Sequence, residues 1–266
     1  MKKLVSLLMA LTLVFACVGC GASNGGSSEA ENTDAGTEAA GSAETEAEDV
    51  KSEGVMTYEE YAAAALDSEV VIEAYVQAKQ SWWEDQATVY AQDKDGGYFL
   101  YNMACSEADY EKLTTGTKIK VTGFKAEWSG EVEIIDASFE IVDGNYVAEP
   151  EDVTSLLGSD DLINHQNKFV SFKGMTVEAA GQDGSGNDVA FLYNWDGSGQ
   201  DGDDLYFNVS LDGQTYTFTV ESYLCDKTTD VYAAVKGLNI GDTVDMEGFL
   251  YWYEGVNPHI TSVTVK

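Results

Sequence analysis

The pattern in this sequence that could hold a metal ion is Asn194-x-Asp196-x-Ser198, followed by a glycine and then by Asp201. Oxygen-bearing side chains at alternate positions before a glycine open many calcium loops, because the turn brings several oxygens to one cation. The pattern then stops, since the twelfth position counted from Asn194 is Leu205 and not the bidentate Glu of such loops. We predict a flexible acidic loop, with a Ca²⁺ site made by the four oxygen-bearing residues as the alternative.

Catalytic groups cannot be assembled from the sequence. His165 lies in an amide-rich linker and His259 in a terminal strand, so neither a histidine pair nor a zinc spacing can be recognised. The 47 Asp and Glu residues make carboxylate pairs too common to be informative. We therefore predict a non-catalytic binding protein with no cofactor, and keep an accessory extracellular hydrolase that uses calcium as an alternative.

Aromatic side chains are the candidates for ligand contact. The sequence has five tryptophans and several tyrosines close to them: Trp82, Trp83, Trp128, Trp195, Trp252, Tyr251 and Tyr253. A set exposed beside acidic residues could stack on a sugar ring or hold a cation. We select Trp128, Tyr251, Trp252 and Tyr253 as ligand-binding candidates. In a strand, alternation would place both tyrosines on the face opposite Trp252, and packing in a core or at an edge is the alternative role.

The net charge of the chain favours some classes of binding partner over others. The formal net charge is -33, and the sequence contains no arginine. Binding of nucleic acid depends largely on Lys and Arg that neutralise phosphates, so nucleic acid is an unlikely partner, and binding of a single strand is the least favoured alternative. The only close set of basic residues is Lys118, Lys120 and Lys125, for which we expect the solvated face of a strand. The negative charge suits a cationic ligand. With the aromatic residues included, the favoured partners are a cation, a carbohydrate or an envelope protein.

The first 20 residues have the features of an export signal. Lys2 and Lys3 precede an uncharged apolar run that is too short to span a membrane. The run ends at Cys17 and Cys20, each of which follows a small residue, and either could be the lipidated cysteine of a bacterial lipoprotein. Residues 21–55 are rich in Gly, Ser, Ala, Thr and Glu, and we expect a disordered acidic tether there. The predicted location is the outer face of a bacterial membrane, with the lipid as the anchor.

The elements that position the candidate residues come from an internal repeat. Residues 113–135 align without a gap with residues 238–260, which begin 125 positions later, and three glycines keep their places. Alternating apolar and polar residues around the middle glycine predict a strand that bends or bulges there. The third glycine predicts a turn before a returning strand. Each copy is therefore a hairpin bent at a glycine.

The same order extends upstream in both halves. First strands are predicted around Val70 and Val170, followed by hairpins over 87–102 and 205–221 and by short helices over 106–113 and 229–238. Five strands with a helix between the third and the fourth are the layout of the OB-fold, a small Greek-key barrel. The predicted fold class is all-β with short helices, in two tandem five-stranded barrels.

With these motifs, both halves resemble the OB-type modules of exported bacterial lipoproteins. The resemblance covers the glycine-marked hairpins and extends over 56–145 and 165–266. It implies a binding module, because OB-folds commonly present the face of strands 2 and 3 to a ligand. Residues 146–164 form the predicted connector, and residues 181–204 form a Gly- and Asp-rich insertion. Helices are expected over 57–67, at one end of the first barrel, and over 150–157.

The two remaining cysteines, Cys105 and Cys225, each follow the second hairpin of their half and so occupy equivalent places. Two such cysteines can meet only if the barrels dock through that face. A disulfide between them is therefore one possibility for an exported protein. Two separate buried thiols are the favoured alternative.

Overall fold

The computed structural model describes residues 51–266. The predicted signal at residues 1–20, including Cys17 and Cys20, and residues 21–50 of the predicted tether lie outside the described residues. Within 51–266, no helix is long and apolar enough to cross a membrane. The described residues belong to one compact unit, so the two predicted barrels can be described together.

The first barrel has the predicted five strands. They are β1 (Glu69–Lys79), β2 (Gln86–Gln92), β3 (Gly97–Ala104), β4 (Thr117–Trp128) and β5 (Glu131–Asn145). The sheet closes in the order β1-β2-β3-β5-β4, with β3 and β5 parallel. Alternate side chains of each strand point inward, so that Val89 of β2 and Leu100 of β3 lie fully buried in the core.

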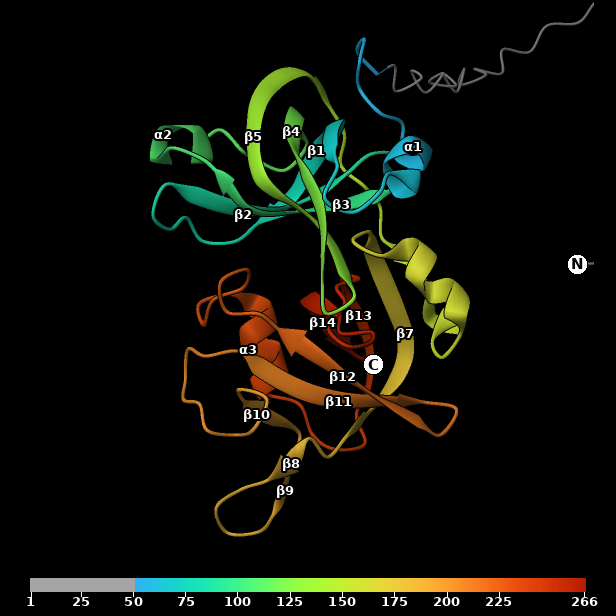
Figure 1. The fold of residues 1–266 in the computed structure, drawn as a ribbon. Coiled ribbons are helices and arrows are strands. Elements are labelled where there is room, and N and C mark those ends of the chain that lie inside the picture. Colours follow the sequence, from blue (N-terminus) through green and yellow to red (C-terminus); the bar gives the residue numbers. More distant parts are fainter. Residues whose placement is uncertain (1–50) are drawn as a thin grey trace, which may run out of the picture. The chain divides into compact units, whose positions relative to one another are not determined.

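The second barrel repeats this topology (Figure 1). Its strands are β7 (Phe169–Glu178), β11 (Leu205–Leu211), β12 (Gln214–Val220), β13 (Thr243–Phe249) and β14 (His259–Val265). The β7–β11 pairing closes the ring, and β12 and β14 are parallel, as β3 and β5 are in the first barrel. The prediction of two tandem five-stranded OB-like barrels is confirmed.

The glycine-marked bends are also confirmed. The register shifts between Thr122 and Phe124 in the first barrel and between Glu247 and Gly248 in the second. A Cβ atom on Gly123 would lie 2.7 Å from Ile134 Cγ2, and one on Gly248 would lie 2.2 Å from the carbonyl oxygen of His259. Both positions require glycine because the next strand approaches the backbone too closely for any side chain.

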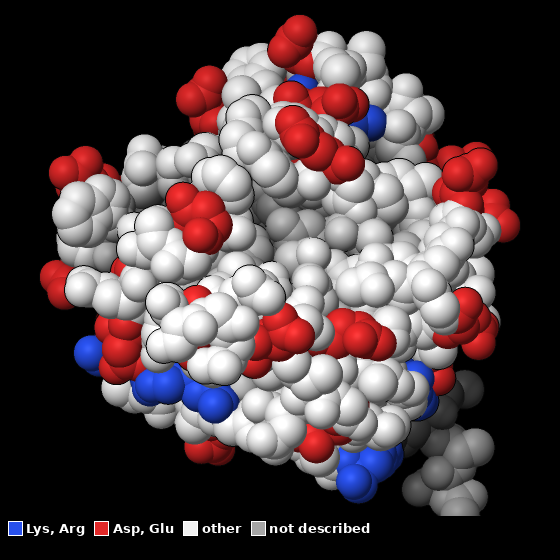
Figure 2. All heavy atoms as spheres, turned by 90° about the horizontal axis from the view of Figure 1, so that it is seen from below, with Lys and Arg blue, Asp and Glu red and all other residues white. Residues whose placement is uncertain are grey.

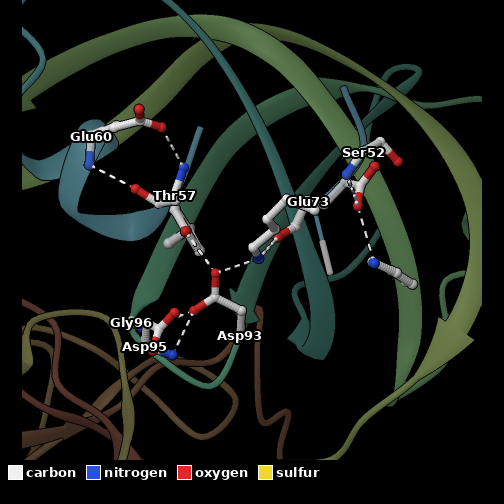
Figure 3. Close-up of polar contacts among 10 residues, drawn as sticks. Ser52, Thr57, Glu60, Glu73, Asp93, Asp95 and Gly96 are labelled. Atoms are coloured by element: carbon white, nitrogen blue, oxygen red, sulfur yellow. Dashed lines mark hydrogen bonds and ion pairs between the residues drawn. The ribbon is translucent and has the colours of Figure 1, made fainter. Parts of the chain in front are cut away.

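Three short α-helices accompany the barrels: α1 (Tyr58–Ala63), α2 (Glu107–Tyr110) and α3 (Asp230–Lys236). α1 begins with a capping box, in which Thr57 Oγ1 accepts from the Glu60 backbone N–H and the Glu60 side chain accepts from the Thr57 N–H (Figure 3). The helix ends at Ala63, earlier than expected. Tyr61 is buried in the core of the first barrel, as a helix at the end of that barrel requires.

The helix expected over 150–157 is absent. In its place are the two-residue strand β6 (Glu151–Asp152) and the 3₁₀ turn η1 (Thr154–Leu156), followed by η2 (Asp160–His165). β6 runs parallel to the start of β7, and the carboxylate of Asp152 accepts from the backbone N–H and the hydroxyl of Thr154. Backbone groups of this segment therefore form hydrogen bonds with the sheet edge and within the local turn, in place of the hydrogen bonds of a helix.

The turn after β2 differs in detail from the prediction. Hairpin turns of this composition suggest positive φ at Asp and Gly, but no residue of 93–97 has a positive φ. The glycines are needed for space, since a Cβ on Gly96 would enter the Tyr58 ring. The fully buried carboxylate of Asp93 accepts from the backbone N–H groups of Asp95 and Gly96 (Figure 3).

The end of the predicted tether is ordered against the first barrel. Lys51 Nζ lies 2.7 Å from Asp93 Oδ2 and donates to the carbonyl of Glu73. The buried Asp93 charge is therefore neutralised by a residue that composition assigned to the disordered segment. Lys51, the first described residue, already belongs to the folded part, which the prediction began at residue 56.

The expectation of a solvated lysine face on β4 is wrong for two of its three residues. Lys118 is buried and lies 3.0 Å from the carboxylate of Glu73. Lys125 is also buried and donates to the carbonyls of Tyr61, Ala62 and Ala64 at the end of α1. Cations often satisfy the last carbonyls of a helix, and this contact fastens α1 to the barrel.

The insertion at 181–204 forms the small strands β8 (Gly181–Gln182), β9 (Asp188–Val189) and β10 (Phe191–Tyr193). β8 pairs with β9, and β10 pairs with β11 of the second barrel. The apolar part of the insertion thus supplies two short strands. The sheet edge of the second barrel is extended by the insertion.

The barrels pack through the outer face of β2 and β3. The rings of Tyr90 and Phe249 are stacked with their centroids 4.3 Å apart, and Tyr90 Oη lies 2.8 Å from Nδ1 of His259. The backbone N–H of Phe169 donates to the side chain of Gln92 at 2.7 Å. The face that OB-folds commonly present to ligands is therefore partly used here for contact between the barrels.

The end of the β4–β5 hairpin extends to the second barrel, as Figure 1 shows. Its turn carbonyl at Ser129 accepts from the N–H of Glu254 at 2.7 Å, and the carboxylate of Glu131 accepts from the N–H of Trp252 at 2.9 Å. The repeated hairpins thus touch each other, and the contact fixes the aromatic segment after β13.

Candidate ligand groove

A groove with a volume of about 1000 Å³ lies where the two barrels meet. Its walls come from β2, β3, β4 and β5 of the first barrel and from β11, β12, β14 and the segment after β13 of the second. The insertion contributes Trp195 and Asp204. The volume is at the upper end of the range for small-molecule sites, which suits a ligand of several linked units.

Exposed aromatic rings line the groove from both barrels: Trp83, Tyr101, Trp128, Trp195, Tyr223 and Tyr253. Trp128 and Tyr253 contact each other with ring centroids 5.1 Å apart, although they belong to different barrels. Rings exposed together in a concave surface are uncommon in a protein that binds nothing, because their burial is favourable. The rings therefore mark the groove as the candidate ligand site.

The structure brings together three of the four predicted ligand-contact residues. Trp128, Tyr251 and Tyr253 all line the groove. Trp252 does not, since its half-buried ring packs against the core of the second barrel. The two tyrosines therefore face the groove and Trp252 faces the barrel core, as the alternation suggested. Residues 251–253 nevertheless lie outside the named strands. Ligand contact by these residues stays a prediction.

Four carboxyl groups line the same groove: Glu133, Asp204, Glu221 and Glu254. Glu221 accepts from the backbone N–H groups of Tyr223 and Leu224 at 3.1 and 2.9 Å, and Asp204 accepts from the N–H of Ser222 at 2.8 Å. Burial raises the pKa of Glu221 to about 7. These contacts hold two of the acceptors in fixed positions.

His259 contributes an uncharged ring to the groove. It is stacked on Tyr251 with ring centroids 4.2 Å apart, and burial lowers its pKa to about 3. The hydrogen bond between Nδ1 and the Tyr90 hydroxyl fits a neutral imidazole. At neutral pH His259 therefore supplies no positive charge to the neighbouring carboxylates.

The residue types that line the groove exclude several ligand classes. Beside the aromatic and acidic groups are amides and hydroxyls, with no Lys or Arg and no Leu, Ile, Val, Met or Ala among the described lining residues. Acidic side chains are also spread over the face drawn in Figure 2, where Lys is seen in only a few places. An anionic ligand meets no counter-charge there, and a lipid chain meets no aliphatic wall.

Several lining residues were not selected from the sequence. Tyr101 lies two positions after Phe99 on the outer face of β3, and Thr219 and Glu221 alternate with the buried Phe218 and Val220. A period of two along the second hairpin of each half could have identified these outward positions. Nothing in the sequence placed the two hairpins in one groove.

The acidic loop, for which a calcium site was the alternative, has other contacts. Asp201 is paired with Lys236, and Asp196 accepts from the backbone N–H of Ser198 at 3.0 Å in a local turn. The half-buried Asn194 lies in the same segment, before these residues. Over residues 51–266, no three His, Cys, Asp or Glu side chains are gathered in a way that could hold a metal ion. Calcium binding through this loop stays a prediction.

The proposed disulfide is not formed. Cys105 and Cys225 are both free and buried. Each is part of the core of its own barrel, so the docking of the barrels through β2 and β3 does not join them. Burial raises the pKa of both thiols, to about 12 for Cys225, as expected for inert packing residues.

Comparison with known proteins adds little. No family model and no curated protein matches the chain. Among solved structures, it is similar to the Ifi202 HINa domain in complex with 20bp dsDNA, with 11% identity and a TM-score of 0.33 over 75% of this chain and 98% of that chain. It is also similar to a murine DNA binding protein bound with ds DNA, with 12% identity and a TM-score of 0.31 over 74% and 97%. Similarities of this degree carry no conclusion about what the present chain binds.

Proposed function

We propose that this protein is a non-catalytic binding module that holds a carbohydrate in the groove between its two barrels. The observation that carries the proposal is the lining of the groove, in which aromatic rings, amides, hydroxyls and carboxylates occur without basic or aliphatic side chains. Sugar rings have apolar faces that stack on aromatic rings and hydroxyl edges that need hydrogen-bond partners. The lining supplies both.

The arrangement of the rings favours an extended ligand. Trp83, Trp128 and Trp195 come from three separate segments of the chain and line one groove of about 1000 Å³. A single ring could use only part of this surface. An oligosaccharide could contact several of these aromatic side chains at once, and the fixed acceptors of Asp204 and Glu221 could orient it.

We further propose that the protein acts outside the cytoplasm, attached to a bacterial membrane by a lipid on Cys17 or Cys20. The short apolar run after Lys2 and Lys3 supports this location. Mass spectrometry of the protein isolated from its own membrane tests the proposal. A diacylglyceryl group on one of the two cysteines is the expected result, and an unmodified mature chain that begins elsewhere would contradict it.

Titration with oligosaccharides tests the carbohydrate proposal. Oligomers of glucose, mannose, N-acetylglucosamine and glucosamine are added while tryptophan fluorescence is followed, because three tryptophans line the groove. We expect at least one oligomer to change the emission with saturation. Trp128→Ala should weaken its binding about tenfold, as for the loss of a central aromatic contact.

Phe124→Ala is the matched control, because Phe124 is an exposed aromatic residue of the same strand that does not line the groove. It should bind like the unchanged protein. The absence of saturable binding for every oligomer would reject the carbohydrate proposal. Salt-sensitive binding of a single-stranded oligonucleotide that is lost in Trp128→Ala would replace it with the nucleic-acid alternative.

A further inference from the structure

Glu133 is a nearly buried carboxyl group in the wall of the groove. It lies on β5 and is only 8% exposed. Within residues 51–266 no hydrogen bond or ion pair engages its carboxylate, and burial is the cause of its raised pKa. Its oxygens are not among the fully enclosed unpaired atoms of the described residues, so a group that enters the groove can reach them and supply a donor.

Among residues 51–266, no cationic side chain faces this carboxylate. The titratable groups around it are Tyr61 of α1, Tyr101 of β3, Glu131 of β5, Glu221 after β12, Tyr251 and Glu254 after β13, and His259 of β14. His259 is neutral, as described above. The nearest lysine of β4, Lys125, is engaged with the carbonyls at the end of α1.

Three acidic side chains lie close enough to Tyr251 to act on its pKa. Glu131, Glu133 and Glu221 all act on its hydroxyl group and raise its pKa further than burial alone does. Its aromatic ring also lies on the groove. A positive charge at this point would meet the Glu133 carboxylate and a ring face together, and these are the two kinds of surface that attract a cation in a protein.

We propose that the part of the groove next to Glu133 and Tyr251 is a subsite for a protonated primary amine carried on a sugar ring. This inference rests on the proposed carbohydrate-binding function and narrows it to glycans with free amino groups. The ammonium group donates to Glu133 and places its charge near the Tyr251 ring. The sugar ring that carries it stacks on the neighbouring aromatic side chains.

The experiment compares two probes, the tetramer of glucosamine and the tetramer of N-acetylglucosamine, by calorimetric titration at pH 6. The two probes share the backbone and differ in whether the nitrogen can carry a charge. We expect the glucosamine tetramer to bind at least tenfold more tightly to the unchanged protein. Glu133→Gln should remove most of this difference, because the amide keeps the shape and loses the charge.

Glu140→Gln is the control, since Glu140 is an exposed residue of the same strand. It should keep the full preference for the glucosamine tetramer, and circular dichroism of each variant checks that it is folded. Equal affinity for the two tetramers overturns the amine subsite and leaves the carbohydrate proposal in place. A preference that survives Glu133→Gln also overturns it.

A third probe separates this inference from the function on which it rests. Spermidine carries amines without a sugar ring. If spermidine binds while no oligosaccharide does, the carbohydrate proposal fails, and with it the assignment of the amine to a sugar. If an uncharged oligosaccharide binds at least as tightly as the glucosamine tetramer, only the amine subsite fails.

Discussion

Glu131, the first residue of β5, has an unusual place for an acidic group. It is fully buried where the barrels meet, and its Oε2 accepts from the Trp252 N–H and the Gln166 side chain. Its Oε1 and Oδ1 of Asn167 have no hydrogen-bond donor among the described residues. Burial raises the pKa of Glu131 to about 8. At neutral pH the folded protein therefore holds a proton here that the unfolded chain releases.

The sign of the resulting pH effect follows from this difference in bound protons. Below the ordinary pKa of a glutamate, 4.5, both states are protonated and the group does not change the stability with pH. Between 4.5 and about 8 the folded state binds more protons than the unfolded state. The free energy of unfolding therefore falls as pH rises through this window, and Glu221 acts in the same direction up to about 7.

We predict that Glu131→Gln stabilises the protein at pH 8 by roughly 1–3 kcal/mol, and that this gain shrinks toward pH 5. The amide is neutral at every pH, keeps an acceptor for Trp252 and adds a donor. Urea unfolding at both pH values measures the effect. Glu140→Gln serves as the exposed control, and a gain of equal size at pH 5 and pH 8 would show that the proton is not its cause.

At the scale of the elements, the two glycine-bent hairpins determine how each barrel closes. Gly123 and Gly248 lie at register shifts between the fourth and fifth strands, where a side chain would enter the neighbouring strand. The obstruction at Gly248 is backbone, the carbonyl oxygen of His259 and Ile260 Cα, whereas the nearest obstruction at Gly123 is a side-chain methyl group. Backbone yields less easily than a side chain.

We therefore predict different costs for the same substitution. Gly248→Ala should lower the free energy of unfolding by about 3 kcal/mol and Gly123→Ala by about 1–2 kcal/mol, because crowding of a packed site is destabilising. Gly184→Ala is the control, since nothing lies within 4 Å of its added Cβ and its φ is not positive. Chemical denaturation ranks the three variants, and equal costs at all three sites would contradict the proposed close approach.

At the scale of the whole described unit, the aromatic contact between the barrels keeps the groove in shape. Tyr90, Phe99 and Phe249 form a buried cluster that belongs to neither barrel core. The groove is lined by Phe99 of this cluster, by His259 beside it and by more distant residues of both barrels. A ligand that touches both walls should therefore bind only when the barrels are docked.

We predict that the unchanged protein unfolds in one calorimetric transition and that Phe249→Ala separates it into two. Loss of a buried phenylalanine side chain costs about 3–5 kcal/mol of stability. Because Phe249 packs in the cluster between the barrels, this loss weakens the contact between the barrels and not the core of either one. Phe124→Ala, at an exposed ring, should keep a single transition. A single transition in Phe249→Ala, shifted to lower temperature, would mean that the barrels are joined by other contacts.

Much of the architecture could be predicted from the sequence because the strands, turns and helix starts of the repeat depend on residues that are close together in the chain. Strand alternation, turn glycines such as Gly116 and Gly241, and the capping box at Thr57 depend on a few neighbouring residues. Predictions failed where a distant partner decides the outcome. Composition alone could not show that Lys51 neutralises Asp93, or that Lys125 binds the end of α1.

The candidate site was only partly accessible for the same reason. Trp128 and the Tyr251 segment could be selected because they occupy matching places in the two hairpins. Glu133 could not be distinguished among many carboxylates, since its importance lies in being buried without a partner. Burial and the lack of a partner are properties of the packed chain, and neither is encoded in a short pattern of residue types.

The sequence by itself determined two OB-like barrels and a strongly acidic composition, because backbone periodicity and charge are sums over local residues. Only the tertiary structure decided that the barrels pack through β2 and β3 and enclose one aromatic groove. That packing depends on side chains such as Tyr90 and Phe249, which lie 159 positions apart and meet only when both barrels are folded. Contacts between residues so far apart produce no periodic pattern in the sequence, and these contacts form the candidate ligand groove.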